Sequence, residues 1–246
     1  MHHGIQGQKW GIRNGPPYPL GSNAHHSSVL YANGKASVSR LLSTDTYNGI
    51  GKTLIHEIKR RKDIKKDVGK PLKRQNVQEP IEASLQLANP SGERKNCANC
   101  SIAGVLRMQG YDVSARTRSV KTATGLPTFL KQAFDGARVY RFSEAQRNTF
   151  TTSSDHAASM LRKRYGDNAS GIIGVQWKNK SSGHAFSWKI QNGKVEFLDF
   201  QSGKDDTMTR KYWKAIDPGK NIIHARLDNL QPNPEYIYEA VQNRSS

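Results

Sequence analysis

From about residue 80 onward, the order of apolar and polar positions predicts a succession of helices and strands. Three stretches have the apolar spacing and the terminal residues of helices. They are 96–110, 124–134 and 155–166. Asp155 is the candidate N-cap of the third helix, and Gly110 and Gly166 are suited to end the first and the third. The segment after residue 80 is therefore predicted to be the folded part of the chain.

Five further stretches have the composition of strands. They are 111–116, 170–178, 183–191, 194–201 and 221–230. The pair Asn192-Gly193 suits a tight turn between two antiparallel strands, so the third and fourth of these stretches should form a hairpin. That hairpin would bring His184 and Asp199 close together.

The first third of the chain has a different character. Residues 1–48 are rich in turn formers and small polar residues and lack a periodic apolar pattern, so we expect a flexible arm. Residues 52–68 have leucine and isoleucine at helical spacing on a strongly basic background, which predicts a short amphipathic helix. Two prolines then interrupt the pattern. We therefore divide the chain into a basic N-terminal arm, 1–79, and a folded domain, 80–246.

The charge and the cysteine count limit the partners and the compartment. The chain has 38 Lys and Arg against 20 Asp and Glu, a formal net charge of +18. This excess favours anionic partners, either nucleic acid, an acidic protein or a membrane surface, and equally suits a solvated basic face. No apolar run has the length of a membrane span, and no signal peptide is evident. Two cysteines cannot form a disulfide framework, so we expect a reducing, cytoplasmic environment.

The two cysteines, Cys97 and Cys100, lie three positions apart at the start of a predicted helix. A helix N-terminus lowers the pKa of a thiol, because its unpaired amides and the positive end of its dipole stabilise the thiolate. Cys97 is placed for this effect, whereas Cys100 lies a turn inside the helix, where a small buried residue is expected. The spacing alone leaves a zinc site, a redox pair and two core cysteines open. A zinc site would need a second ligand pair that the chain lacks, and a thioredoxin-type pair would need a strand where the sequence is polar and loop-like.

A thiolate that attacks an amide also needs an imidazole to protonate the leaving amine, and an acceptor that orients this imidazole. His184 and Asp199, on the two strands of the predicted hairpin, can meet these needs. The order Cys, His, Asp along the chain is the papain-like order. His156, at a predicted helix start, and His224, in a predicted strand, are the competing histidines.

The chain resembles the papain-fold toxin family, the Tox-PL group of bacterial polymorphic toxins, in three strings: NCANCSIAGVLRMQGYDVSAR, SSGHAFSWKIQNGKVEFLDFQSGK and ARLDNL. The family pattern runs Asn-Cys-x-x-Cys, Arg-x-x-Gly-Tyr-x-Val, Gly-His and Asp-x-Gln, and the resemblance covers about residues 90–231. It implies an α+β, papain-like fold in which a helix carrying Cys packs on an antiparallel sheet carrying His and Asp. It also implies a cysteine-dependent amidohydrolase, chiefly a protein-glutamine deamidase, without a metal or an organic cofactor.

Carried over by position, the resemblance makes Cys97 the nucleophile, His184 the general base and acid, and Asp199 the residue that orients the imidazole. Gln201, in the Asp-x-Gln motif, would help to hold the histidine or the substrate amide. For the oxyanion hole we expect the backbone amide of Cys97 and, as a second donor, Asn96. The chain departs from the family at RMQG, where Arg-Arg-Gly is frequent, and at the phenylalanine inside the last motif, where proline is frequent. Both departures lie outside the proposed chemistry.

Residues 2–20, HHGIQGQKWGIRNGPPYPL, are similar to a short segment near the chain ends of phage and prophage head-associated proteins of Gram-positive bacteria. The similarity implies a prophage product, either associated with the virion or delivered to a target cell as a toxin. The expected partners are a target protein that bears a glutamine and has an acidic surface, phage capsid or DNA at the basic arm, and an immunity protein. Two alternatives stay open: a virion-associated structural or nucleic-acid-binding protein with an inactive papain-like domain, and a papain-like cysteine protease.

Overall fold

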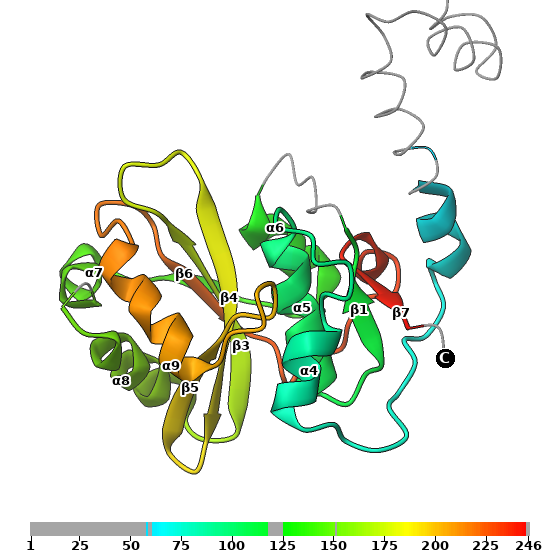
Figure 1. Ribbon diagram of the computed structural model, residues 1–246, viewed down its shortest axis with the longest axis horizontal. Helices are drawn as coiled ribbons and strands as arrows, with labels where there is room; N and C mark the ends of the chain where they lie inside the picture. Colours follow the sequence, from blue (N-terminus) through cyan, green and yellow to red (C-terminus); the bar gives the residue numbers. More distant parts are fainter. Residues whose placement is uncertain (1–57, 59–60, 118–124, 151, 245–246) are drawn as a thin grey trace, which may run out of the picture. The chain divides into compact units, whose positions relative to one another are not determined.

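The computed structural model describes residue 58 and residues 61–117, 125–150 and 152–244 (Figure 1). The chain divides into two compact units, with the boundary between Lys66 and Asp67. In the first unit, residues 61–66 are helical, within the predicted basic helix. The predicted arm at 1–48, its phage-type segment at 2–20 and the first turns of that helix lie outside the described residues. No helix in the described part is both long enough and apolar enough to span a membrane.

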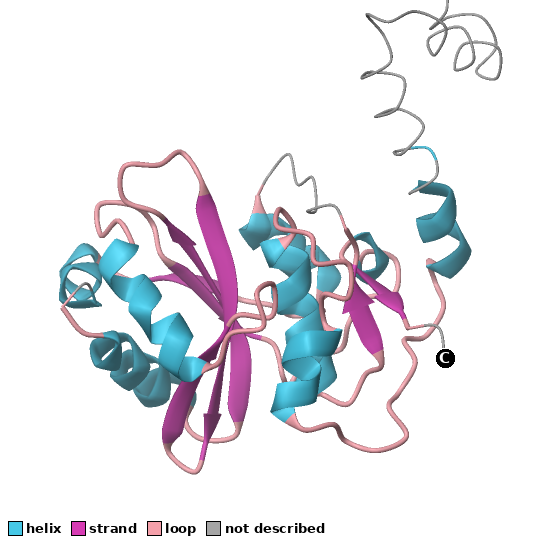
Figure 2. Cartoon of the chain, in the orientation of Figure 1, coloured by secondary structure: helices cyan, strands magenta, loops and turns pink. Residues whose placement is uncertain are grey.

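The second unit mixes short helices with antiparallel strands (Figure 2). Its α-helices are α4 (Ile81–Leu87), α5 (Cys97–Met108), α6 (Leu126–Ala133), α7 (Glu144–Phe150), α8 (Ser154–Tyr165) and α9 (Asp206–Thr209). Its strands are β1 (Val113–Ala115), β2 (Val139–Arg141), β3 (Ala169–Gln176), β4 (Gly183–Gln191), β5 (Lys194–Leu198), β6 (Ile223–Arg226) and β7 (Val241–Asn243). It also contains the 3-10 helices η3 (Arg210–Ala215) and η4 (Ile237–Glu239). This content confirms the predicted α+β class.

The central sheet has the strand order β2-β6-β3-β4-β5, and every neighbouring pair is antiparallel. Strands β4 and β5 are joined by the predicted two-residue turn, with Gln191 paired to Lys194. Asn192 and Gly193 both have positive φ angles, 52° and 72°, as a type I′ turn requires. The hairpin predicted from this Asn-Gly pair is therefore confirmed. A separate small sheet pairs β1 with β7.

Helices cover both faces of the central sheet (Figure 1). Helix α5 packs against β3 and β4 on one face, and α8 and α9 contact β5 on the other. Side chains alternate along β4 accordingly, and Phe186 and Trp188 join the apolar cluster that includes residues of α8. Between them, the small residue Ser187 donates a hydrogen bond from Oγ to the carbonyl of Ser101 in α5, at 3.2 Å. The backbone of α5 therefore lies close to the strand that carries His184.

Helix α5 begins at Cys97, within one residue of the predicted start. Its apolar face, formed by Ile102, Val105 and Leu106, is fully buried. Gly110, just after the helix, has a φ of 84°, in the left-handed region that favours glycine, so the helix ends where the sequence predicts. The interior position of this helix leaves its N-terminal residue, Cys97, at the edge of the core.

Gly104, in the middle of α5, permits a close contact with the loop after β5. A Cβ atom at this position would lie 2.1 Å from Cδ2 of Phe200, whose side chain is fully buried. Because Phe200 directly follows Asp199, the contact sets the distance between α5 and the loop that carries Asp199. We expect Gly104→Ala to lower the free energy of unfolding by about 1–3 kcal/mol, because overpacking outweighs the gain of about 1 kcal/mol in helix propensity. Denaturant unfolding measures this change.

The matched control for Gly104→Ala is the same substitution in a Phe200→Leu background. Leucine is smaller and more flexible than phenylalanine, so the added methyl group should cost less there, and the two substitutions should be non-additive. An equal cost in both backgrounds would contradict this account of Gly104.

The structure corrects two details of the prediction. The N-cap of α8 is Ser153, whose Oγ accepts a hydrogen bond from the backbone amide of Asp155 at 3.1 Å. Asp155 therefore lies in the first turn and not at the cap. Strand β5 ends at Leu198, one residue before Asp199. Asp199 instead pairs with Lys204 through two backbone hydrogen bonds, of 2.9 and 3.0 Å, which close a short loop.

Candidate active site

Cys97 is the first residue of α5, and its thiol is free and partly buried. The ring of His184 and the backbone amides of Ala98 and Ala185 form hydrogen bonds with its sulfur. Burial alone would raise the pKa of this thiol, but the hydrogen bond to His184, the charge of that ring and the two amides outweigh burial. The pKa of Cys97 therefore lies below its ordinary value, which favours the thiolate.

His184, the second residue of β4, lies between Cys97 and Asp199. Its Nε2 atom is 3.1 Å from Oδ2 of Asp199, which leaves Nδ1 for the sulfur of Cys97. Burial would lower the pKa of the imidazole, but the hydrogen bonds and charges of Asp199 and Cys97 raise it to about 9. At neutral pH this geometry favours a thiolate beside an imidazolium.

The carboxylate of Asp199 is almost fully buried and is held by several donors. Besides the ring of His184, the hydroxyls of Ser202 and Tyr212 donate to Oδ2, each at 2.6 Å. The backbone amide of Gln201 donates to Oδ1 at 3.0 Å. Burial would raise the pKa of this carboxyl, but these donors and the charge of His184 lower it to about 2. Asp199 therefore stays ionised and can orient the imidazolium.

Two aromatic residues that the sequence did not point to enclose the imidazole. Trp177 is stacked on the ring of His184, with 5.6 Å between centroids and 22° between planes. Tyr212 meets the same ring edge-on, at 5.6 Å and 78°. Because the rings exclude water from the imidazole, they strengthen its hydrogen bond to the carboxylate. They come from the loop after β3 and from η3, so no local motif could have identified them.

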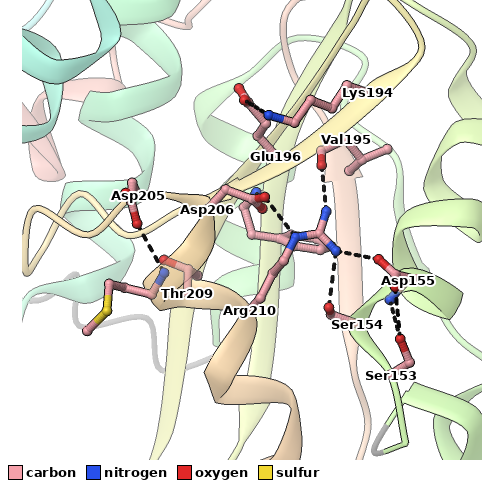
Figure 3. A network of polar contacts seen from close by, with 12 residues as sticks. Ser153, Ser154, Asp155, Lys194, Val195, Glu196, Asp205, Asp206, Thr209 and Arg210 are labelled. Atoms are coloured by element: carbon pink, nitrogen blue, oxygen red, sulfur yellow. Dashed lines mark hydrogen bonds and ion pairs between the residues drawn. The ribbon is translucent and has the colours of Figure 1, made fainter.

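Arg210 fixes the segment that carries Tyr212 onto the rest of the fold (Figure 3). Its guanidinium donates to Oδ2 of Asp206 at 2.7 Å, to Oδ1 of Asp155 at 2.6 Å and to the carbonyl of Val195 at 2.8 Å. These acceptors belong to α9, α8 and β5, and the planar fork of arginine can reach all of them at once. The position of the Tyr212 hydroxyl on the carboxylate is therefore set by three elements of the fold.

The predicted supporting residues, Gln201 and Asn96, contact each other. Nε2 of Gln201 donates to Oδ1 of Asn96 at 3.2 Å. The Asn96 amide donates to the carbonyl of Arg116 at 3.0 Å and to Oδ1 of Asn89 at 3.3 Å. Asn96 is fully buried and both hydrogens of its amide have acceptors inside the protein, so it is not free to stabilise an oxyanion. We infer a positioning role instead, in which Gln201 and Asn96 tie the Asp199 loop to the start of α5.

The second cysteine, Cys100, is a free thiol that is fully buried. Burial raises the pKa of Cys100, and the negative charges of Cys97 and Asp199 act in the same direction. Cys100 therefore stays protonated at neutral pH and fills space in the core, as the sequence predicts.

The competing histidines have structural partners of their own. Nδ1 of His156 lies 2.9 Å from the carbonyl of Thr149. His224 is buried, with Nδ1 at 2.8 Å from the hydroxyl of Tyr165, and burial lowers the pKa of His224 to about 4. Within the residues that the structure describes, no group of three or more His, Cys, Asp or Glu side chains could hold a metal ion.

An open pocket adjoins the imidazole that contacts Cys97. Its lining combines residues of the site with polar and cationic neighbours: Gly92, Arg94, Trp177, His184, Asp199, Gln201, Ser202, Lys204 and Tyr212. This pocket gives a substrate side chain a place beside the ring of His184.

Residues 95–204 match the sequence model of a protein family described as papain fold toxin 1, glutamine deamidase. The matched segment contains Cys97, His184 and Asp199. Among solved structures, a variant of the Salmonella effector SpvD is similar, with a TM-score of 0.41 and 14% sequence identity over 77% of this chain and 96% of that chain. A search of curated proteins gives no match. The family match confirms the predicted resemblance to papain-fold toxins and the predicted papain-like fold.

Proposed function

We propose that the chain is a cysteine-dependent amidohydrolase, and the match of residues 95–204 to the glutamine deamidase family of papain-fold toxins supports this proposal. Its proposed substrate is a glutamine side chain of a target protein. The observation that supports the proposal best is the row of contacts from Cys97 through His184 to Asp199. These contacts supply a nucleophile, an acid and base, and an orienting group in hydrogen-bonding reach of one another.

The reaction would begin when the Cys97 thiolate attacks the side-chain amide carbon of the glutamine. The carbonyl carbon becomes tetrahedral, and His184 then gives its proton to the amide nitrogen, which leaves as ammonia. A thioester joins Cys97 to the substrate. His184, now neutral, takes a proton from water, and the resulting hydroxide hydrolyses the thioester to glutamate and the free thiol. Asp199 holds the ring in one orientation throughout and stabilises its charged form.

The tetrahedral intermediate carries a negative oxygen that needs hydrogen-bond donors. The start of α5 offers them, because the first amides of a helix have no acceptor within the helix. The backbone amide of Cys97 is the proposed donor, and the positive end of the helix dipole acts in the same direction.

The pKa values of Cys97 and His184 define the pH range of the proposed activity. The thiolate forms as the pH rises through the lowered pKa of Cys97, and the imidazolium is lost as the pH rises through about 9. Ammonia release should therefore rise on the acid side and fall above about 9, where no proton remains for the leaving ammonia. Alkylation of Cys97 by iodoacetamide needs only the thiolate. Its rate should therefore rise with pH as ammonia release does, but should not fall at alkaline pH. Ammonia release that keeps rising above this range would contradict the role of His184 as the acid.

The test of the proposed function is ammonia release in a cell extract. We expect untreated protein to release ammonia, and protein alkylated beforehand at Cys97 with iodoacetamide to release none. Mass spectrometry of the extract should find glutamines converted to glutamates only with the untreated protein. New peptide termini in place of converted glutamines would indicate a cysteine protease. Equal ammonia release by the untreated and the alkylated protein would contradict the proposal that the chain is a cysteine-dependent enzyme.

The family match also supports a role as a toxin. A toxin of this kind would be made in the cytoplasm and delivered to a cell that contains the target protein, and an immunity protein would protect the producer. The string at residues 2–20 supports a prophage origin and a contact with the virion. If no glutamine is converted, and DNA binding falls steeply with salt and requires residues 1–79, a structural role in the virion replaces this proposal.

A further inference from the structure

The pocket beside the proposed catalytic residues carries two cations, Arg94 and Lys204. Nζ of Lys204 lies 5.1 Å from the centroid of the Tyr212 ring. The backbone of Lys204 is held to Asp199 by the two hydrogen bonds that close the loop. Contacts of both its backbone and its side chain therefore fix this ammonium group at the pocket.

Arg94 lines the pocket from the loop before α5 and is exposed. The neighbouring carboxylate, Glu93, faces its own loop, where Oε1 accepts the backbone amides of Arg94 at 2.8 Å and of Lys95 at 3.0 Å. Across the described part of the chain, neither the Arg94 guanidinium nor the Lys204 ammonium forms an ion pair with a carboxylate. Both charges are therefore open to a ligand.

The lining of the pocket contains one carboxylate, that of Asp199, and its oxygens already accept four hydrogen bonds. The pocket is therefore a cationic space with no acidic group available to balance it. An anionic group of a substrate would supply the missing charge, whereas a cationic group would be repelled.

We propose that Arg94 and Lys204 form a subsite for carboxylate side chains, so that the enzyme prefers glutamines flanked by aspartate or glutamate. This subsite rests on the proposed function, because it sets the substrate preference of the same site. Arginine can bind a carboxylate through two parallel hydrogen bonds, and lysine acts as a point charge. Both interactions would hold the substrate chain while its glutamine side chain lies next to Cys97.

The subsite can be tested without a known target, by comparing two reagents that alkylate the same thiol. Iodoacetate carries a negative charge and iodoacetamide is neutral, so the ratio of their rates at Cys97 reports the local potential. The charge of His184 contributes to this ratio in every variant. We expect the double variant Arg94→Gln and Lys204→Gln to lower the ratio about threefold to sixfold, which is the effect that two unit charges about 8–12 Å from a reacting atom have in water. The iodoacetamide rate itself should change little, which excludes a general loss of thiol reactivity.

Lys163→Gln is the matched control, because Lys163 is an exposed cation of α8, which packs on the opposite face of the sheet from α5. It removes one positive charge and should leave the ratio unchanged. High salt should reduce the ratio of the wild type towards that of the double variant, because ions screen charges that are exposed to solvent.

The outcomes separate the two proposals. If both reagents alkylate Cys97 but the ratio is the same in the wild type and the double variant, the subsite is wrong and the proposed function stands. If neither reagent prefers Cys97 to Cys100, both proposals fail. With synthetic peptides, glutamine flanked by glutamate should have a lower KM than glutamine flanked by lysine, and the double variant should lose this difference in KM. A preference for lysine-flanked glutamine would overturn the subsite.

Discussion

Cys97→Ala should reduce ammonia release by roughly 10³-fold or more, to the background of the extract, because alanine has no atom that can form the thioester. The sulfur of Cys97 is the group that contacts His184 and the amides of Ala98 and Ala185, so we expect no other side chain to replace it. Ammonia release by the purified variant, normalised to folded protein, measures the effect. The variant should keep its cooperative unfolding, since the thiol is only partly buried.

Cys100→Ala is the matched control, since it removes the same atom one turn further along the same helix. Cys100 is fully buried, so the variant should lose stability by about 1 kcal/mol and keep most of its activity. If Cys100→Ala lost as much activity as Cys97→Ala while still folded, the assignment of the nucleophile would be wrong.

His184→Ala should lower activity by roughly 10²- to 10⁴-fold, because it removes the acid that protonates ammonia and the base that activates water. It should also move the pKa of Cys97. The hydrogen bond and the charge of His184 are the largest causes that lower this pKa, so their loss leaves only the two backbone amides against burial, which raises it. Alkylation by iodoacetamide at neutral pH should therefore slow and recover only at higher pH. The rate of alkylation as a function of pH measures this shift.

His156→Ala is the control for the loss of an imidazole, because His156 is exposed on α8 and its ring bonds the carbonyl of Thr149. It should leave both activity and alkylation unchanged. Free imidazole added to His184→Ala should restore part of the activity. An unaltered pH dependence of alkylation in His184→Ala would show that Cys97 and His184 do not form an ion pair.

The positions of residues that lie in a recognisable local sequence pattern were predictable from the sequence. Cys97 follows polar loop residues and precedes a helical apolar pattern, and the structure has it at the first position of α5. The Asn-Gly pair predicted the β4-β5 hairpin, whose positive φ angles the structure shows. The turn predicted that His184 and Asp199 would lie near each other, but Asp199 lies one residue beyond β5, in the loop that pairs with Lys204, and this loop completes its position.

The groups that complete the site could not be predicted, because only the folded chain brings them together. Trp177 and Tyr212 have no motif, and they reach His184 from a loop after β3 and from η3. The expectation for Asn96 as an oxyanion donor came from its position beside Cys97. Sequence position does not show where an amide finds its acceptors, and those of Asn96 are inside the protein.

The phenylalanine that departs from the family pattern has a role that the sequence did not indicate. The ring of Phe200 fills the space next to Gly104, so a large side chain in the loop fits against a position of α5 that has no side chain. A pattern along one chain cannot show such a pair, since the two residues lie in separate motifs. The structure explains this departure as a packing contact that sets the position of Asp199.

The central claim is that Cys97 converts glutamine to glutamate by way of a thioester. Its most direct test is to incubate a cell extract with the protein in water enriched in heavy oxygen, and to map the label by peptide mass spectrometry. We expect heavy oxygen in the side-chain carboxylates of new glutamates at defined former glutamines, with the wild type and not with Cys97→Ala. Label at new peptide carboxyl termini instead, or equal labelling by both proteins, would contradict it.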